Sequence, residues 1–253
     1  MNGSFSRRHL LRGAASLAAL AAAPRAAVAA EPASPAVCMS FVFTNKSRFD
    51  GDRFRDHHLP LLRRIYGDSV ERIELRLAPR PAKGQPLPPI PASVALWIRS
   101  IPAFGEAAAK GGQEITADLE KVSKSPAYVQ YEQVIAQVGD ARDAVPGGTP
   151  VSSLFYPNGD EAKWDAQQYV GTYLPLMVET YGLEAIRRVE VVRGAQAPGG
   201  GRAPFIAAVH TYLRDEALFQ SRARSAGMRL MGEAAKVTAI RPLFGNFRVH
   251  AAG

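Results

Sequence analysis

Cysteine is almost absent from this sequence of 253 residues, because Cys38 is the only one. A single cysteine excludes an internal disulfide and a site in which several thiolates hold a metal ion. We expect Cys38 to be a small apolar strand residue, with a reactive thiol as the alternative. The histidines show no spacing with carboxylates that is typical of a metal site, and no phosphate loop or nucleophile elbow is present. No metal ligands are therefore predicted.

Long apolar runs are also missing, apart from an Ala- and Leu-rich run at residues 13–23. This run is shorter than the roughly 20 residues that span a membrane as a helix. It follows the twin-arginine pair Arg7-Arg8 and precedes the small-x-small pattern Ala27-Val28-Ala29. We predict that residues 1–30 are a twin-arginine signal peptide and that the mature protein is periplasmic or secreted, with no stable membrane anchor. A general secretory signal with a basic start is the alternative.

The excess of positive charge is smaller than the whole sequence indicates. The chain has 31 basic and 23 acidic residues, a formal net charge of +8. Four of the arginines and none of the acids lie in the predicted signal peptide, so the mature net charge is +4. No basic stripe interleaved with aromatic residues is visible, and nucleic acid is therefore not an expected partner.

The second half of the sequence repeats the first at a shift of 115 residues, for example from His58 to position 173. The matched segments are Asp50 with Asp165, Leu59-Pro60-Leu61 with Leu174-Pro175-Leu176, Tyr66-Gly67 with Tyr181-Gly182, Trp97 with Tyr212, and Phe104 with Phe219. A constant register over roughly a hundred residues indicates duplication. We predict a first repeat at residues 36–138, a Gly- and Pro-rich linker at 139–150 and a second repeat at 151–251.

Each repeat has the pattern strand, helix, strand, strand, helix, strand. In the first repeat we expect these elements at residues 37–44, 51–65, 70–77, 93–100, 103–123 and 128–137. This order is typical of a ferredoxin-like α+β fold, whose sheet has both helices on one face and leaves the other face bare. Two copies in one chain can cover each other. The predicted fold is an intramolecular barrel of two ferredoxin-like repeats, a pseudo-dimer that is monomeric in solution.

The first helix of each repeat has recognisable start and stop signals. Asp50 and Asp165 can cap its N-terminus, and a catalytic acid is the alternative role for each. Phe49 with Phe54, and Trp164 with Tyr169, are spaced as hydrophobic staples. Pro60 and Pro175 should kink or restart the helix, and Gly67 and Gly182 should follow its end.

His58 shares one predicted helix face with Phe54, Leu61 and Ile65, so its imidazole should point toward the sheet. The second repeat has Tyr169, Tyr173, Leu176 and Thr180 on this face. A buried imidazole must be hydrogen-bonded, and it is also suited to moving protons near neutral pH. Both a structural and a functional role for His58 stay open.

These residues resemble the EthD family, whose pattern is approximately Arg-Phe-Asp-x-Asp-Tyr-Tyr, three residues, then His-x-Pro-Leu. The first repeat has Arg48-Phe49-Asp50-Gly51-Asp52-Arg53-Phe54 and His58-Leu59-Pro60-Leu61. The second repeat has Tyr156-Pro157-Asn158-Gly159, which matches the family's Tyr-Pro-Asn-x near the first strand, and its third strand at residues 203–213 is close to the family's third strand. The resemblance covers nearly all of residues 37–249. It implies a dimeric α/β barrel, a superfamily that includes monooxygenases, isomerases, aldoxime dehydratases and haem enzymes. Fold analogy does not supply the reaction.

The family pattern has one histidine in the helix and another in the third strand. The first repeat has His58 in the helix but Ala95 in the strand, whereas the second has His210 in the strand but Tyr173 in the helix. If one active site needs both histidines, each repeat has half of it. Either the protein binds without catalysing, or one site survives in altered form.

Three hypotheses for function follow. The first is an enzyme for a small apolar or phenolic molecule, with His58 as acid or base and Asp50 or Asp52 orienting it. The second is a non-catalytic binding or accessory protein. The third is a haem protein with His210 or His58 as axial ligand, although no cofactor is the primary expectation. The candidate catalytic residues are His58, Asp50 and His210, and the candidate substrate-binding residues are Trp97, Tyr173, Tyr212 and Phe54.

Overall fold

The structure is a computed structural model that describes residues 37–45, 49–141, 145–159 and 163–252. The predicted signal peptide therefore lies outside the described residues. Among the helices that are described, none is both long and apolar enough to span a membrane.

Within the described residues, eight antiparallel strands close into one barrel, with the order β1-β3-β2-β8-β5-β7-β6-β4. The strands are β1 (Val37–Phe43), β2 (Val70–Leu77), β3 (Ala92–Ile98), β4 (Tyr128–Gly139), β5 (Pro150–Pro157), β6 (Ile186–Gln196), β7 (Phe205–Leu213) and β8 (Leu243–Ala252). The two repeats join at the pairs β2–β8 and β4–β6, so each repeat completes the sheet of the other. The predicted fold class is confirmed.

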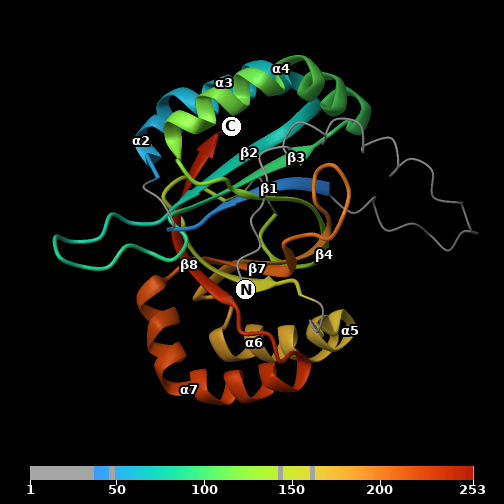
Figure 1. Ribbon diagram of the computed structural model, residues 1–253. Coiled ribbons are helices and arrows are strands. Elements are labelled where there is room, and N and C mark those ends of the chain that lie inside the picture. Colours follow the sequence, from blue (N-terminus) through green and yellow to red (C-terminus); the bar gives the residue numbers. More distant parts are fainter. Residues whose placement is uncertain (1–36, 46–48, 142–144, 160–162, 253) are drawn as a thin grey trace, which may run out of the picture.

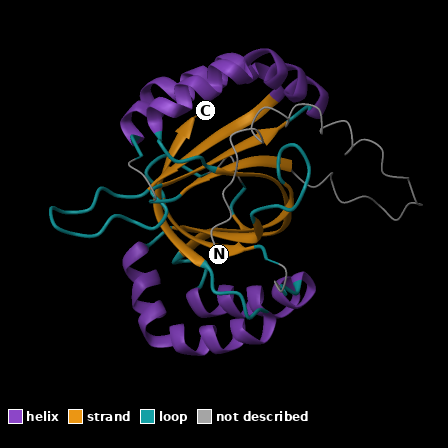
Figure 2. Ribbon diagram, viewed as in Figure 1, coloured by secondary structure: helices purple, strands orange, loops and turns teal. Residues whose placement is uncertain are grey.

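The helices form two layers outside the barrel, one for each repeat (Figures 1 and 2). The first layer contains α2 (Gly51–Arg53), α3 (Leu59–Tyr66) and α4 (Ile101–Val122), and the second contains α5 (Ala166–Gln168), α6 (Leu174–Tyr181) and α7 (Glu216–Val237). This layering divides the buried residues that the structure describes among three regions. Two cores lie between a helix layer and the barrel wall, and the third lies inside the barrel.

Alternation along the strands decides which core each side chain enters, because successive side chains of a strand point to opposite faces. In β2, Ile73 and Leu75 face the first helix layer, whereas Glu74 and Arg76 face the barrel interior. In β7, Val209 faces the second helix layer and Tyr212 the interior. The outer cores are almost purely apolar, and most of the buried charge is inside the barrel.

The predicted start and stop signals of the first helix are confirmed in both repeats. Asp50 accepts a hydrogen bond from the backbone N–H of Arg53, and Asp165 does the same for Gln168. The staple rings lie 5.8 Å apart for Phe49 and Phe54, and 5.0 Å apart for Trp164 and Tyr169. Gly67 and Gly182 end the helices at φ of 47° and 70°, where a side chain would be strained.

Each of these helices contains a π-helical turn, at Phe54–His58 and at Tyr169–Tyr173. Pro60 and Pro175 stand in the first turn of the α-helical segment that follows, so the predicted restart is confirmed. The wider turn shifts the following residues by one position. The prediction that His58 points inward is confirmed, whereas Leu61 and Leu176, which were expected on the same face, are only half-buried. The next residues, Leu62 and Met177, are the fully buried ones.

Candidate functional site

A cluster of charged and polar side chains fills the middle of the barrel, and we call it the interior cluster. Its members are Cys38, Ser40, Arg72, Glu74, Arg76, Gln130, Glu132, Ser153, Arg188, Glu190, His210 and Tyr212. Most of these residues are fully buried. Burial of so many charged groups is costly unless they are paired and hydrogen-bonded. The pairing within the cluster therefore indicates which groups are satisfied by protein atoms alone.

Glu74 is the best-satisfied carboxylate of the interior cluster. It accepts hydrogen bonds from Arg76 Nε at 2.6 Å, from Arg72 Nη2 at 2.7 Å and from the Tyr212 hydroxyl at 2.6 Å. Arg76 Nη2 donates in turn to the Tyr212 oxygen at 2.8 Å. Burial alone would raise the pKa of Glu74, but the two guanidinium groups lower it. Glu74 is thus held ionised in a closed network that joins β2 of the first repeat to β7 of the second.

Glu132 forms a second, smaller network. It accepts hydrogen bonds from Ser40 Oγ at 2.7 Å, from Gln130 Nε2 at 2.8 Å and from the Cys38 thiol at 3.4 Å. Burial raises the pKa of Glu132 and also raises that of Cys38 well above its usual value. Cys38 is therefore a protonated thiol inside the barrel, which favours the structural role expected for it over a reactive thiolate.

His210 also faces the barrel interior, where its Nδ1 lies 2.9 Å from Ser153 Oγ. Burial, together with the positive charges of Arg76 and Arg188, lowers the pKa of His210 well below its usual value. The imidazole is consequently neutral at neutral pH. A neutral histidine bonded to a serine hydroxyl adds a polar contact to the cluster without adding charge.

His58 occupies a different place, between the helices and the barrel wall of the first repeat. Its ring is 2% exposed, and its Nδ1 lies 3.0 Å from Asp118 Oδ2 on α4. Burial lowers the pKa of His58, although Asp118 acts in the opposite direction. Because a carboxylate can only accept, the neutral imidazole carries its proton on Nδ1, and Nε2 is left as the basic atom. Arg53 holds the same carboxylate at 2.7 Å.

Asp118 was missed by sequence reasoning, which proposed Asp50 or Asp52 as the group that orients His58. The structure corrects this, because Asp50 caps the helix and Asp52 forms ion pairs with Arg55 and Arg80. Burial alone would raise the pKa of Asp118, but hydrogen bonds from Arg53 and His58 lower it. No sequence motif contains both His58 and Asp118, which are 60 residues apart and meet only when α4 packs on the π-helical turn.

The candidate substrate-binding residues do not form one site. Trp97 and Tyr212 face the barrel interior, whereas Phe54 packs on His58 in the first outer core and Tyr173 lies in the second. The barrel wall separates these three compartments. The structure thus brings Tyr212 close to the interior cluster and Phe54 close to His58, but brings neither of them to Tyr173.

The structure also changes the interpretation of the two histidine positions, one in the helix and one in the third strand of each repeat. His58 and its counterpart Tyr173 lie on the outer side of the barrel wall, between the wall and a helix layer. Ala95 and its counterpart His210 lie on the inner side and face the barrel interior. The two histidines of the pattern therefore stand on opposite faces of the sheet. The expectation that each repeat retains half of one site is wrong, because a single repeat with both residues would hold them on opposite sides of the barrel wall.

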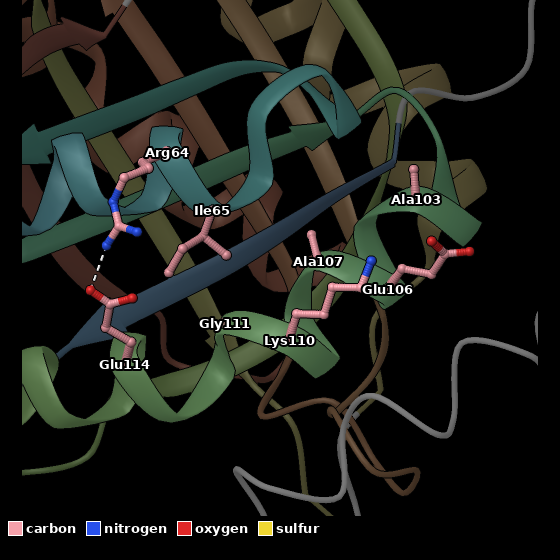
Figure 3. Close-up of a pocket in the computed structure, with 8 residues that line it drawn as sticks. All are labelled: Arg64, Ile65, Ala103, Glu106, Ala107, Lys110, Gly111 and Glu114. Atoms are coloured by element: carbon pink, nitrogen blue, oxygen red, sulfur yellow. Dashed lines mark hydrogen bonds and ion pairs between the residues drawn. The ribbon is translucent and has the colours of Figure 1, made fainter.

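A pocket of about 400 Å³ lies on the outer surface between α3 and α4 (Figure 3). It is lined by Arg64, Ile65, Ala103, Glu106, Ala107, Lys110, Gly111 and Glu114. Gly111 allows the close packing of the two helices here, since a Cβ at this position would clash with the side chain of Ile65. The ion pair between Arg64 and Glu114 closes one side of the pocket. None of the candidate site residues lines it.

The described side chains contain two buried histidines but no cluster of metal ligands. In the part of the chain that the structure describes, no three His, Cys, Asp or Glu residues are grouped as metal ligands. An axial haem ligand needs a ring nitrogen that faces a slot wide enough for the macrocycle. The ring of Phe54 lies 4.7 Å from that of His58, and the ring of Phe155 lies 5.6 Å from that of His210. These aromatic rings pack beside both imidazoles.

Comparison with solved structures supports the barrel architecture. The chain is similar to an anthrone oxidase-like protein over 87% of its length and 95% of that protein, with a TM-score of 0.53 and 12% identity. It is also similar to a putative monooxygenase from Fusobacterium nucleatum over 88% of this chain and 94% of that one, with a TM-score of 0.54 and 8% identity. At these identities the likeness shows the fold alone.

An EthD-like protein from Ralstonia eutropha JMP134 matches 40% of this chain and 91% of its own length, with 22% identity and a TM-score of 0.37. No family model matches the sequence, and no curated protein matches it. The fold defines the chain as an α+β protein with a dimeric α/β barrel, built here from two ferredoxin-like repeats in tandem.

Proposed function

We propose that this protein binds a small apolar or phenolic organic molecule in its first repeat, and that His58 moves a proton on that molecule. The observation that carries the proposal is the buried hydrogen bond between His58 and Asp118. Burial keeps the imidazole neutral, and the carboxylate fixes Nδ1 as the protonated nitrogen. An imidazole prepared in this way can accept a proton at Nε2.

The proton transfer requires no other reactant. A ligand hydroxyl or acidic C–H gives its proton to Nε2 and becomes an anion, while His58 becomes an imidazolium next to the Asp118 carboxylate. The ion pair with Asp118 stabilises that imidazolium, as a carboxylate does beside other catalytic histidines. Asp118 is 13% exposed and Arg53 is 32% exposed, so this pair connects the buried ring to solvent.

The matched test uses the counterpart position in the second repeat. 1-Naphthol, catechol and anthrone are each incubated with the purified protein. Binding is followed by fluorescence, and turnover is followed by chromatography. We expect His58→Gln to lower turnover by about 10²–10⁴-fold, whereas Tyr173→Phe should leave it within about twofold. Equal turnover by His58→Gln and the unsubstituted protein would exclude the role of His58.

A second candidate function is binding without turnover. It is favoured by the placement of the two histidine positions on opposite faces of the sheet, which leaves His58 without a second imidazole on its side of the barrel wall. Native mass spectrometry of the exported protein distinguishes the two functions. A ligand that is released unchanged, with no product from any compound of the panel, supports binding alone, and a Soret band in the absorption spectrum would support a haem protein instead.

We further propose that the chain is a divergent tandem relative of the EthD family, exported by the twin-arginine route and monomeric in solution. The motifs around Asp50 and Asp165, the pair Arg7-Arg8 and the closure of the barrel within one chain support these proposals. N-terminal sequencing of the protein after export and its mass in solution test the second and third. A mature N-terminus that still contains Arg7 would contradict export with cleavage.

A further inference from the structure

Arg188 is the residue of the interior cluster that protein atoms satisfy least. Its side chain is fully buried, and Nε, Nη1 and Nη2 make no hydrogen bond to any described group. The Glu190 carboxylate lies 3.6 Å from Nη2, beyond hydrogen-bonding distance. The guanidinium carbon lies 4.1 Å above the centre of the Tyr212 ring. The Tyr212 ring lies against the guanidinium, but it accepts no hydrogen bond from the N–H groups in the guanidinium plane.

Arg72 stands at the corresponding strand position of the first repeat, and its guanidinium is hydrogen-bonded. Both arginines lie opposite an aromatic residue of the neighbouring strand, Arg72 opposite Trp97 and Arg188 opposite Tyr212. Arg72 donates to Glu74 two residues later at 2.7 Å, and its side chain is 13% exposed. Arg188 is two residues before Glu190 in the same way, yet it is more deeply buried and is not hydrogen-bonded.

The interior cluster also holds many ionisable groups away from water. Three guanidinium groups face three carboxyl groups, Glu74, Glu132 and Glu190, and His210 is neutral. Burial raises the pKa of Glu132, which favours the neutral form of this carboxyl group. Glu190 lies near enough to Arg188 for an ion pair, but buried N–H groups that make no hydrogen bond are costly, and native proteins satisfy such groups almost without exception. An additional anion would accept hydrogen bonds from the unsatisfied N–H groups of Arg188.

We propose that the barrel interior binds a small planar monoanion of the carboxylate class, held by the guanidinium of Arg188. The fork of N–H groups on a guanidinium matches the two oxygens of a carboxylate, and such paired bonds are among the strongest in proteins. The Tyr212 ring keeps the guanidinium in place from one face. This site lies on the opposite side of the barrel wall from His58 and is independent of the function proposed there.

The experiment measures anion binding directly on the purified protein. ¹³C-labelled formate is titrated at constant ionic strength, with chloride as the exchanged anion, and its line width is followed by NMR with acetate as competitor. We expect saturable broadening with the unsubstituted protein and its loss, by at least tenfold in affinity, in Arg188→Met. The matched control Arg72→Met should bind formate within about twofold of the unsubstituted protein, because Arg72 is already paired with Glu74.

A second variant keeps the test decisive if Arg188→Met does not fold. Glu190→Gln removes a negative charge that lies next to the guanidinium, and it should tighten formate binding by about tenfold, or 1.4 kcal/mol. The proposal is overturned if the unsubstituted protein shows no saturable binding, if Glu190→Gln leaves the affinity unchanged, or if folded Arg188→Met binds as the unsubstituted protein does. None of these results bears on turnover by His58, so the two proposals fail separately.

Discussion

The two halves of the barrel interior carry related strands with different charge pairing. In the first repeat, β2 points Arg72, Glu74 and Arg76 into the barrel, and all three are hydrogen-bonded. In the second, β6 places Arg188 and Glu190 at the corresponding positions, but Val192 follows where the first repeat has Arg76. The replacement of an arginine at position 76 by Val192 in the second repeat therefore accompanies the difference between the two halves. The first half has a fully hydrogen-bonded network, and the second leaves Arg188 without a hydrogen bond.

This difference shows that the halves depend on each other through more than strand pairing. Arg76 and Glu74 of the first repeat both hydrogen-bond to the Tyr212 hydroxyl, which belongs to the second repeat. Trp97, the counterpart of Tyr212, has no hydroxyl to return the same contact. After duplication the two repeats kept their caps, staples and π-helical turns, whereas the interior cluster became asymmetric. We infer that the interior cluster, which exists only when both repeats are present, is where the copies specialised.

The largest expected effect comes from breaking the closed network. Arg76→Met leaves Glu74 with only Arg72 and Tyr212, and it removes the donor to the Tyr212 oxygen. Loss of one partner from a buried ion pair costs about 3–5 kcal/mol. We expect the free energy of unfolding, measured by denaturant titration, to fall by about that amount.

Arg188→Met is the matched control for this change. It removes a guanidinium of similar burial that donates no hydrogen bond, so its cost should be clearly smaller than that of Arg76→Met. Equal costs for the two variants would show that hydrogen bonding does not distinguish the halves of the interior.

The outer layers offer a second comparison, between Asp118 and its counterpart Glu233. Asp118 holds His58 and Arg53, whereas Glu233 is exposed and pairs with Lys236. Asp118→Asn should cost about 1–3 kcal/mol, because it weakens charge-assisted hydrogen bonds to a buried partner. It should also lower the pKa of His58 further, since Asp118 is the group that opposes the effect of burial.

The measurement is the NMR titration of the His58 ring together with a denaturant titration. Glu233→Gln serves as the control and should change the free energy of unfolding by less than about 0.5 kcal/mol, as is usual for exposed ion pairs. An unchanged pKa of His58 in Asp118→Asn would contradict the assignment of Asp118 as its partner.

His210 should make the second repeat sensitive to acid where Ala95 of the first repeat is not. Its pKa is well below the usual value in the folded protein, so the unfolded chain binds a proton first as the pH falls. The stabilisation from neutral His210 is complete above about pH 6.5 and is lost as the pH falls through that value, by up to about 1.4 kcal/mol per pH unit. Glu74, whose pKa is lowered in the folded protein, changes the stability only at lower pH, where its carboxylate becomes protonated.

His210→Ala copies the first repeat and should flatten the dependence of Tm on pH between 6.5 and 5. His58 and His250 also have lowered pKa values, so part of the slope should remain. A slope identical to that of the unsubstituted protein would show that His210 does not contribute to acid sensitivity.

Much of the fold was predictable because its signals are local. The caps at Asp50 and Asp165, the prolines that restart the helix and the Gly residues at its end each act within a few residues. The shift of 115 residues then supplied the long-range information that one sequence rarely provides. The π-helical turn was not predicted, because a 3.6-residue period was assumed throughout, and the buried face after His58 was therefore displaced by one residue.

The candidate site was less predictable because its contacts cross long separations. Asp118 meets His58 only when two helices pack, and the interior cluster needs strands from both repeats. One signal was present in the sequence: Arg72, Glu74 and Arg76 alternate with apolar residues in a strand that the fold covers on both faces. Charged residues in such a strand indicate a polar barrel interior, whereas a purely apolar core would have needed none.

The smallest expected effect tests a feature that the repeats share. Asp50 and Asp165 cap equivalent helices, at 3.0 Å from Arg53 N and 2.9 Å from Gln168 N. Replacement of either by Ala should cost about 1 kcal/mol, and the two costs should agree within about 0.5 kcal/mol. If Asp50 is only a cap, Asp50→Ala should also leave the pKa of His58 unchanged in the NMR titration. A larger cost at Asp50, or a shift in that pKa, would mean that Asp50 takes part in the site of the first repeat, and the repeats would then differ in their caps as well as in their interior.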